Sequence, residues 1–358
     1  MSRKISLSFA LRMIVVAVGL AASLMPAESA NELLTRARQT FGALPKNMGT
    51  AEFPVTAERV ELGHKLFFDP RISADGAVSC SRCHLPALYG TDGLAKPLGA
   101  HDRVNPRNAP TVLNAALQFK AHWRGDRVNV EDQARQALIG PPSFGNPDYA
   151  AAMMKLKAIP GYAQLFAKAF PGESEPVTPD NWGKAIGAYE RTLVTPSRFD
   201  DYLGGNENAL SNSEQHGLRL FMEKGCTGCH NGPGIGGGMF QKFGVREDYW
   251  KETKVTEPDK GRFDVTKDEA DLYVFKAPSL RNVAMTPPYF HDGSVRSLAD
   301  AVRIMARVQL DTTLTPDEIE DLIAFLASLT GTLPDNFVTA PVLPAAGFNP
   351  QPGNKPDH

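Results

Sequence analysis

The sequence predicts a mainly α-helical protein of two domains, with long loops and few short strands. Three observations predict this class. Apolar residues recur at helical spacing behind capping residues in several stretches, whereas strand patterns are few and short. The chain contains 31 glycines and 28 prolines, which favours long loops. A cysteine–histidine motif occurs twice, 146 residues apart, and a chain of 358 residues allows roughly two domains.

Composition argues against two broad classes of protein. Hydrophobic residues make up 42% of the chain and charged residues 22%, which is typical of a folded globular protein rather than a wholly disordered one. The formal net charge is −2, whereas nucleic-acid-binding proteins usually carry a basic surplus. We therefore expect no nucleic-acid partner.

Residues 1–30 have the layout of a secretory signal peptide. A basic start, Met1–Lys4, precedes an apolar run that is densest over Met13–Leu24, and small residues follow around Ala27–Ala30. The alternative is an uncleaved membrane anchor, but the run is shorter than the roughly 20 residues that span a bilayer, and Arg12 interrupts its start. No later segment is apolar enough to span. We therefore expect a soluble protein exported to a bacterial periplasm.

Every cysteine lies in one of two pentapeptides with the pattern C-x-x-C-H. They are Cys80-Ser81-Arg82-Cys83-His84 and Cys226-Thr227-Gly228-Cys229-His230. This pattern is the attachment signature of c-type haem, because two thiols reach the two vinyl groups of one porphyrin and the next residue puts an imidazole under the iron. A redox C-x-x-C pair or half a zinc site is an alternative for a single copy. Two copies that use every cysteine of an exported chain favour two covalent haems.

Each motif follows a predicted amphipathic helix, and this repetition indicates a duplicated cytochrome c-like unit. The first helix covers Thr56–Phe68. The second begins at a capping box, Ser211–Glu214. We divide the chain into the signal peptide, an N-terminal cytochrome c-like domain over residues 31–196 and a C-terminal one over residues 197–358, each with one haem.

Further segments complete the predicted fold. Thr178–Leu193 predicts a helix that closes the first domain, and Thr195–Gly205 is interpreted as a linker or turn region. Thr315–Glu318 is another capping box, with proline at the first helical position, and predicts a helix that stops at Gly331. The tail after Leu333 is rich in Pro, Asn and Gly, which predicts an extended arm.

Beyond the haem motifs, the chain resembles the bacterial di-haem cytochrome c peroxidases and the related MauG-type di-haem oxidases. The resemblance extends from about Leu62 to Gly331 and rests on several separated motifs. They are LGHKLFFDPR (Leu62–Arg71), RNAPT (Arg107–Thr111) with Asn114–Ala116, YERTLVTP (Tyr189–Pro196), KGRF (Lys260–Phe263), PSLRNVA (Pro278–Ala284) and PYFHDG (Pro288–Gly293). The resemblance implies two cytochrome c-like domains whose haems have different roles.

By this resemblance, the second-domain haem is the high-potential, electron-accepting one, with its iron held by His230 and Met305. Met305 lies 14 residues after His291, as the family motif places it. Methionine ligation raises the potential of a haem. The alternative is that Met305 is ordinary core on a helix over Ala301–Val308, with Met285 as the fallback ligand. A tyrosine at this position would indicate the MauG branch, so methionine favours the peroxidase branch.

The resemblance makes the first-domain haem the peroxidatic one, with His84 as its proximal ligand. Relatives carry a distal histidine on the loop between this haem and the RNAPT motif, where this chain has His101. In relatives this histidine binds the iron in the fully oxidised state and leaves when the other haem is reduced, which opens the site to peroxide. The alternative is that His101 is a solvated loop residue, and both resting states remain open.

Trp123 matches the family tryptophan that lies between the two haems, and we expect it to relay electrons or to share oxidising equivalents between the irons; the alternative is a core tryptophan. Its neighbours differ from the family, because relatives have roughly Phe-Trp-Asp-Gly-Arg and this chain has His122-Trp123-Arg124-Gly125-Asp126. Gln133 lies ten residues after Trp123 and matches a distal-pocket glutamine.

One departure concerns the acid–base group. Peroxide cleavage needs a base that moves a proton from the near oxygen to the far one. The family uses a glutamate shortly after a Gly-Pro step, but the segment Gly140–Asp148 (GPPSFGNPD) contains none. Asp148 is the nearest carboxylate, and we expect it to act as a shorter substitute. The alternative is that Asp148 is a surface residue or a helix cap.

The resemblance also implies a calcium ion between the domains. Asn108 would supply a side-chain oxygen, and Thr286 and Pro288 would supply backbone carbonyls, with waters completing the shell. Oxygen ligands suit this hard cation. The alternative is that the three residues only form turns.

These predictions together point to reduction of hydrogen peroxide to water. Electrons would come from a small periplasmic donor, a monohaem cytochrome c or a cupredoxin, enter at the second haem and pass through Trp123 to the first. A homodimer is possible because relatives often dimerise. Two alternatives remain: a MauG-like oxidase that modifies a partner protein, and a non-enzymatic di-haem electron carrier.

Overall fold

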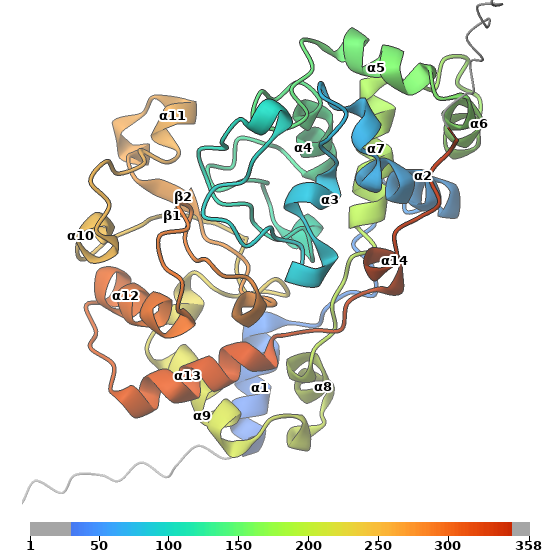
Figure 1. The fold of residues 1–358 in the computed structure, drawn as a ribbon. Helices are drawn as coiled ribbons and strands as arrows, with labels where there is room; N and C mark the ends of the chain where they lie inside the picture. Colours follow the sequence, from blue (N-terminus) through green and yellow to red (C-terminus); the bar gives the residue numbers. More distant parts are fainter. Residues whose placement is uncertain (1–29, 346–358) are drawn as a thin grey trace, which may run out of the picture.

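The computed structural model describes residues 30–345, so the predicted signal peptide falls almost entirely outside the described residues. Helices joined by long loops make up most of the described chain (Figure 1). Its strands are β1 (Phe240–Lys242) and β2 (Val274–Lys276), which pair antiparallel with Gln241 opposite Phe275. No helix over residues 30–345 is both long and apolar enough to cross a membrane. The expected mainly α-helical class with few short strands is confirmed.

The N-terminal half is built on the crossing of α2 (Ala57–Phe68) and α7 (Pro179–Glu190). A Cβ at Gly63 would lie 1.9 Å from the carbonyl oxygen of Ala185, so only glycine allows the two helices to approach this closely. Thr56 caps α2 as expected, because its hydroxyl accepts a hydrogen bond from the Arg59 N–H at 3.3 Å. The other helices of this half are α3 (Cys80–Cys83), α4 (Val130–Ala137), α5 (Tyr149–Lys157) and α6 (Pro160–Ala169).

The C-terminal half repeats this construction with α9 (Asn212–Glu223) and α13 (Pro316–Ser328). A Cβ at Gly217 would lie 1.9 Å from the carbonyl oxygen of Asp321, the same close approach as in the first half. The capping boxes at Ser211 and Thr315 both form as expected. This parallel agrees with the predicted duplication. The other helices of this half are α8 (Arg198–Gly204), α10 (Tyr249–Thr253), α11 (Phe263–Thr266) and α12 (Leu298–Leu310).

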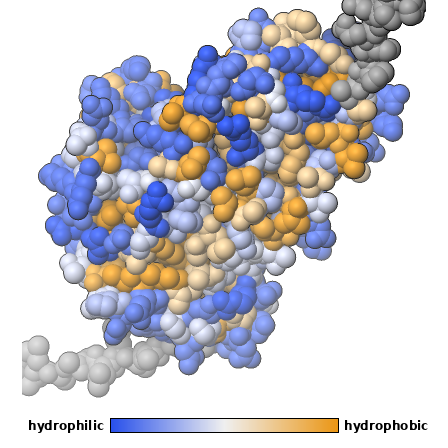
Figure 2. Space-filling model, in the orientation of Figure 1, coloured by the Kyte–Doolittle hydropathy of each residue, from blue (hydrophilic) through white to orange (hydrophobic). Residues whose placement is uncertain are grey.

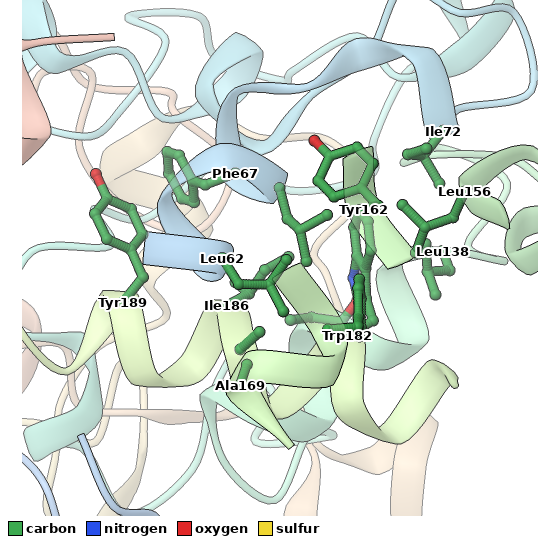
Figure 3. Close-up of a cluster of buried hydrophobic side chains, with 14 of the residues drawn as sticks. Leu62, Phe67, Ile72, Leu138, Leu156, Tyr162, Ala169, Trp182, Ile186 and Tyr189 are labelled. Carbon is green, nitrogen blue, oxygen red and sulfur yellow. The ribbon is translucent and has the colours of Figure 1, made fainter. Parts of the chain in front are cut away.

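Each half has its own hydrophobic core. The N-terminal cluster (Figure 3) gathers side chains of α2, α4, α5, α6 and α7 around Trp182, which is fully buried. A second cluster lies among α8, α9 and α13, and a smaller third cluster packs Tyr249 against α12. Full burial of a large apolar side chain contributes about 1.5–3 kcal/mol to the stability of the fold. Each half buries several such side chains, so each half has a core of its own to stabilise it.

The segment Thr195–Gly205 contains the helix α8, where the sequence suggested a linker or turn. Ser197 and Asp200 form a capping box, with the Ser197 N–H donating to Asp200 Oδ2 at 2.8 Å. Phe199 and Tyr202 lie one helical turn apart and are fully buried in the C-terminal core. The linker interpretation is wrong because this apolar pair has a core to pack against.

The two ends of the chain depart from the predicted division at residue 196. Helix α1 (Ala30–Phe41) belongs to the N-terminal range, yet Leu33 and Phe41 are buried in the C-terminal core. In the opposite direction, α14 (Asp335–Val338) brings Phe337 into the N-terminal core. The predicted extended arm thus contains a short helix and crosses from the C-terminal to the N-terminal half. It crosses because the apolar side chain of Phe337 is buried in the N-terminal core.

Several loops contain single 3-10 turns, and the face of the molecule shown in Figure 2 is largely polar. Figure 2 shows a face on which hydrophilic residues dominate and hydrophobic residues form separate patches, as is normal for a folded protein. The 3-10 turns lie at Pro70–Ile72, Pro86–Leu88, Ala100–Asp102, Ala115–Leu117, Glu207–Ala209, Cys226–Gly228, Glu269–Asp271 and Val283–Met285.

Candidate functional site

Each C-x-x-C-H segment forms one helical turn, α-helical over Cys80–Cys83 and 3-10 over Cys226–Gly228, and the same hydrogen bond closes both turns. The N–H of His84 donates to the carbonyl of Cys80 at 3.0 Å, and the N–H of His230 donates to the carbonyl of Cys226 at 3.0 Å. Residues three and four apart share one face of such a turn. Each motif therefore presents its two thiols and its imidazole on one side, as attachment of a porphyrin and ligation of its iron require.

Backbone carbonyls orient both imidazoles. Nδ1 of His84 lies 2.9 Å from the carbonyl oxygen of Gly90, and Nδ1 of His230 lies 3.2 Å from that of Pro278. Desolvation lowers the pKa of each histidine to about 4, so both rings are neutral at pH 7. A neutral ring whose Nδ1–H donates to a carbonyl has its Nε2 lone pair free for a metal. Both residues thus fit the predicted role of proximal ligand.

A glycine makes the second of these hydrogen bonds possible. Gly236 has a φ of +119°, and a Cβ there would lie 2.1 Å from the Pro278 oxygen and 3.0 Å from Nδ1 of His230. Any other residue would displace the hydrogen bond that sets the ring orientation.

The second motif opens into a cavity that also contains Met305. Cys226, Cys229 and His230 line it together with Met305 of α12, and apolar side chains such as Leu322 of α13 complete the wall. These donors and this apolar wall fit a haem held between a histidine and a methionine. Met285, the fallback ligand, is 43% exposed and does not line this cavity.

Trp123 lines the same cavity and is fixed by both halves of the chain. Its indole Nε1–H donates to the Asn108 carbonyl at 3.0 Å, and its own carbonyl accepts the Lys276 N–H at 2.8 Å. Its ring meets that of His291 edge to face, with centroids 6.3 Å apart. The adjacent His122 lies close enough to His84 for its positive charge to lower the pKa of that ring further. Trp123 thus lines the cavity of the second motif while its neighbour lies near the first, and its role between two haems stays a prediction.

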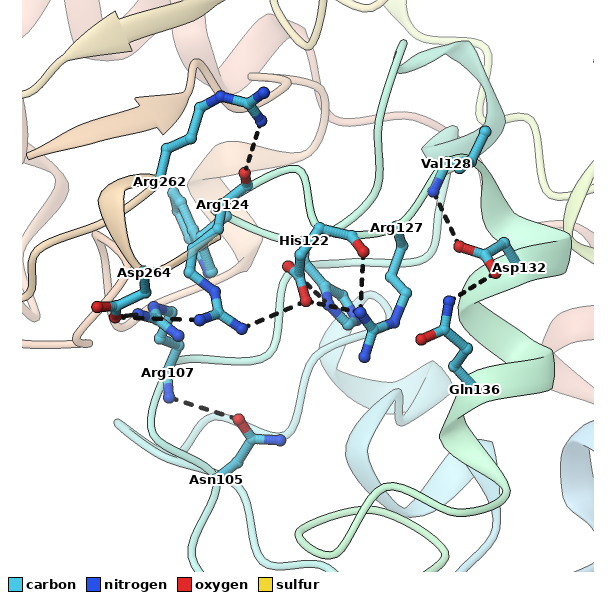
Figure 4. A network of polar contacts seen from close by, with 12 residues as sticks. Asn105, Arg107, His122, Arg124, Arg127, Val128, Asp132, Gln136, Arg262 and Asp264 are labelled. Carbon is cyan, nitrogen blue, oxygen red and sulfur yellow. Dashed lines mark hydrogen bonds and ion pairs between the residues drawn. The ribbon is translucent and has the colours of Figure 1, made fainter. Parts of the chain in front are cut away.

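The altered neighbours of Trp123 form contacts between the halves (Figure 4). Asp126 is bound by His122 at 3.3 Å, by Arg124 at 3.3 Å and by Arg127 at 2.8 Å. Burial would raise the pKa of Asp126, but the His122 hydrogen bond and these cations hold it well below its usual range. Arg124 also approaches Asp264 of the C-terminal half at 4.0 Å.

A stronger ion pair joins the halves nearby. Arg107 pairs with Asp259: Nη2 donates to Oδ1 at 2.7 Å, and Nε lies 2.6 Å from Oδ2. Arg262 donates to the carbonyl of Arg124 at 3.4 Å. The reversed order of arginine and aspartate after Trp123 thus gives a charge network that holds the Trp123 loop against the C-terminal half.

The remaining predicted residues of the first site are spread apart. His101 is exposed, has a φ of +57°, and is held by its N–H donating to Asp75 Oδ2 at 2.7 Å. Gln133 is half-buried on α4. Asp148 is exposed and caps α5, with Oδ1 accepting the Ala151 N–H at 2.7 Å. Within the described part of the chain, no hydrogen bond or ring contact joins these three residues to His84.

The position of Asp148 fits the helix-cap alternative. Asp148→Asn keeps a good capping residue and removes the negative charge, so we expect peroxidase turnover within about twofold of the wild type and little change in stability. Asp148→Ala should lower the free energy of unfolding by about 1 kcal/mol through loss of the cap. Steady-state turnover and urea unfolding measure the two effects. A tenfold loss of turnover in Asp148→Asn with unchanged stability would instead make it the base.

Glu190 is a buried carboxyl beside the first motif for which the sequence predicts no role. It is 4% exposed, and its negative charge adds to the desolvation that raises the pKa of Cys80. Desolvation first, and then the charge of Glu131, raises the pKa of Glu190 itself to about 8. Arg191 does not neutralise it, because Arg191 is paired with Glu131 at 2.7 Å. The signal in the sequence was only the YERTLVTP motif.

Because its pKa is raised, Glu190 makes the free energy of unfolding fall as the pH increases. The folded protein keeps this carboxyl protonated up to about pH 8, whereas the unfolded chain ionises it above its ordinary pKa of 4.5. Its stabilising effect is therefore full below pH 4.5 and is lost as the pH rises through about 8. Glu190→Gln should flatten the fall in the free energy of unfolding over this interval, measured by urea unfolding at a series of pH values. Exposed Glu173→Gln is the control, and parallel profiles for wild type and Glu190→Gln would contradict the assignment.

The three predicted calcium ligands lie around one cavity. Asn108, Thr286 and Pro288 all line the cavity that contains Trp123. The Asn108 amide donates from Nδ2 to the Leu94 carbonyl at 2.8 Å, and its backbone N–H donates to the His291 carbonyl at 2.8 Å. Within residues 30–345 these hydrogen bonds use only the donors of Asn108, and the calcium ligand set stays a prediction.

Lys276 is a second buried ionisable residue for which no sequence motif predicts a role. It ends β2, lines the cavity with His230 and is 5% exposed. Its ammonium group donates to Oε1 of Gln118. The signal in the sequence was a lysine inside the apolar run Val274–Pro278, because a charge within a buried strand needs a partner.

Comparison with known proteins agrees with this geometry. A family model described as di-haem cytochrome c peroxidase matches residues 57–208, and one described as cytochrome c matches residues 215–330. The chain is 42% identical to cytochrome c551 peroxidase of Nitrosomonas europaea, over 85% of this chain and 88% of that protein. It is 41% identical to cytochrome c551 peroxidase of Pseudomonas aeruginosa, over 90% of this chain and 92% of that protein. A solved MauG-like protein associated with microbial copper homeostasis superposes with a TM-score of 0.72 at 31% identity, covering 83% of this chain and 95% of that one.

Proposed function

This chain belongs to the di-haem cytochrome c peroxidase family, and we propose that it reduces hydrogen peroxide to water in the periplasm with electrons from a small cytochrome c or cupredoxin. One observation supports the proposal: Trp123 lines the cavity of the second C-x-x-C-H motif, its neighbour His122 lies near His84 of the first, and hydrogen bonds from both halves of the chain hold Trp123. Bound at the two motifs, the haems supply one-electron redox chemistry.

The residues of the chain divide the work between two sites. His230 and Met305 hold the second haem as the point of electron entry, and a methionine ligand keeps its potential high. Trp123 connects this site to the first one. His84 would anchor the first haem, which when bound would supply the redox chemistry for reducing peroxide, with two electrons and two protons, to two waters. His101, on the exposed loop after the first motif, would be the distal histidine of this site.

The remaining parts of the proposal concern assembly. A calcium ion bound by Asn108, Thr286 and Pro288 holds the loop of Asn108 against the C-terminal half. The carbonyl of Asn108 on this loop accepts the hydrogen bond from Trp123. This arrangement is supported by the Asn108 N–H hydrogen bond to the His291 carbonyl at 2.8 Å. Gln133 orients groups in the distal pocket of the first haem. The exported protein forms a homodimer, as relatives often do.

A second candidate function is oxidation of a partner protein in the manner of MauG. Two observations favour it: the segment Gly140–Asp148 has no glutamate, and the fold matches a solved MauG-like protein at 31% identity. Met305, where the MauG branch has tyrosine, argues for the peroxidase.

Steady-state turnover of hydrogen peroxide with a reduced monohaem cytochrome c decides between these functions. The peroxidase predicts donor oxidation at two equivalents per peroxide, with saturation in both substrates. A protein that carries two haems, accepts electrons and leaves peroxide unreduced would overturn the proposal and leave either the oxidase or the simple electron carrier.

A further inference from the structure

Lys276 is a buried cation with no carboxylate partner. It is 5% exposed, and its ammonium group meets the neutral amide oxygen of Gln118. Across residues 30–345, no carboxylate lies within ion-pair distance of it. Burial removes water from the ammonium group and lowers the pKa of Lys276 to about 8. A buried charge is costly unless it is paired, and an amide oxygen satisfies only one of the three ammonium donors.

The other cations that line the same cavity are already satisfied. Lys224 is paired with Glu318 at 2.6 Å, and Arg281 is paired with Asp200 at 2.8 Å. Lys242 lines the cavity but is exposed, so water solvates its charge. Lys276 is therefore the buried cation of this cavity whose charge nothing in the described chain balances.

The missing anion has an obvious chemical source. A haem attached through Cys226 and Cys229 carries two propionate carboxylates on the edge opposite its vinyl groups, and Lys276 lines the cavity that holds His230 and Met305. We propose that Lys276 binds a propionate of the second haem, with Gln118 as its second partner. Lys276 comes from the C-terminal half and Gln118 from the N-terminal half, so the propionate joins the two halves.

This contact places the propionate beside the proposed electron path. The backbone N–H of Lys276 donates to the carbonyl of Trp123 at 2.8 Å, so the residue that binds the propionate also holds Trp123.

The charge of the Lys276 ammonium group also affects the reduction potential of the second haem. An unpaired propionate stabilises the oxidised haem, which carries one more positive charge, whereas a paired one does not. Lys276 thus acts as a positioning residue that keeps the second haem easier to reduce.

Redox titration of neutral variants tests the proposal directly. In Lys276→Met and Lys276→Gln, the ratio of reduced to oxidised second haem at a fixed potential should fall at least tenfold, about 59 mV for one electron. Lys276→Arg keeps the cation and should stay within twofold of the wild type. Lys242→Met removes an exposed cation from the same cavity wall and should also stay within twofold. Lys276→Gln gives the same measurement if Met is not accommodated beside Gln118.

Three results would overturn the proposal. One is an unchanged ratio in both neutral variants, and another is an equal fall in Lys242→Met. The third is a fall confined to the first haem. The inference rests on haem attachment at the second motif, which a pyridine haemochrome count of the wild type checks without any assay of turnover. A sample with two haems and normal titration behaviour that fails to reduce peroxide would count against the proposed function alone.

Discussion

Replacing Met305 by leucine should lower the reduction potential of the second haem by at least about 120 mV, a hundredfold change in its one-electron equilibrium. The physical reason is that a thioether ligand favours the reduced iron, and leucine has no atom that can bind the metal. Electron entry then becomes unfavourable, so peroxidase turnover should fall at least tenfold. Spectroelectrochemical titration measures the potentials of both haems, and steady-state assays with a reduced cytochrome c measure the turnover.

The chain offers a matched control for this change. Met285→Leu removes a thioether from a residue that is 43% exposed and does not line the cavity of the second motif. We expect its potentials and turnover to match the wild type. A lower reduction potential in Met285→Leu with an unchanged one in Met305→Leu would make Met285, and not Met305, the iron ligand. An unchanged potential in both variants would exclude Met305 and Met285 as ligands of either haem.

The parts of the fold that the sequence predicts are those coded locally. Thr56, Ser211 and Thr315 are capping residues, and each helix begins where its cap indicates. A cap is recognisable because its hydrogen bonds join residues only three positions apart. The hydrogen bonds that close the C-x-x-C-H turns are equally local, because each joins residues four positions apart.

The parts that the sequence did not predict depend on distant partners. Helix α8 also has a cap at Ser197, but its short apolar pattern is decisive only because the C-terminal core lies beside it. The packing of α1 and Phe337 on the opposite halves joins residues far apart in the chain. No local pattern encodes which core a terminal segment will cover.

The same division applies to the candidate site. The ligand roles of His84, His230 and Met305 are predictions from motifs, and the structure gives these residues environments that suit those roles. Glu190 and Lys276 are ordinary acidic and basic residues in the sequence. They become informative only through burial without a matched counter-charge, which is a property of the assembled cavity and core.

Replacing Trp123 by phenylalanine should slow electron transfer between the two sites at least tenfold while both haem potentials stay near their wild-type values. Phenylalanine keeps an aromatic ring beside His291 but is much harder to oxidise than indole, and it cannot donate the 3.0 Å hydrogen bond to the Asn108 carbonyl. The first site would then receive its second electron slowly, and turnover should fall in parallel. Stopped-flow reduction of the oxidised protein, followed at both haems, measures the transfer rate.

Trp182→Phe separates this effect from simple loss of an indole. Trp182 also donates its Nε1–H to a backbone carbonyl, that of Ala134 at 3.1 Å, but it lies in the N-terminal hydrophobic cluster of Figure 3 and does not line the cavity. Its replacement should lower stability by about 1–3 kcal/mol, because a buried acceptor is left unsatisfied, and should leave the transfer rate unchanged. If Trp123→Phe loses stability and keeps its transfer rate, Trp123 is a core residue and electrons cross between the halves by another path. If both variants slow the transfer equally, the cause is loosened packing rather than the indole between the two motifs.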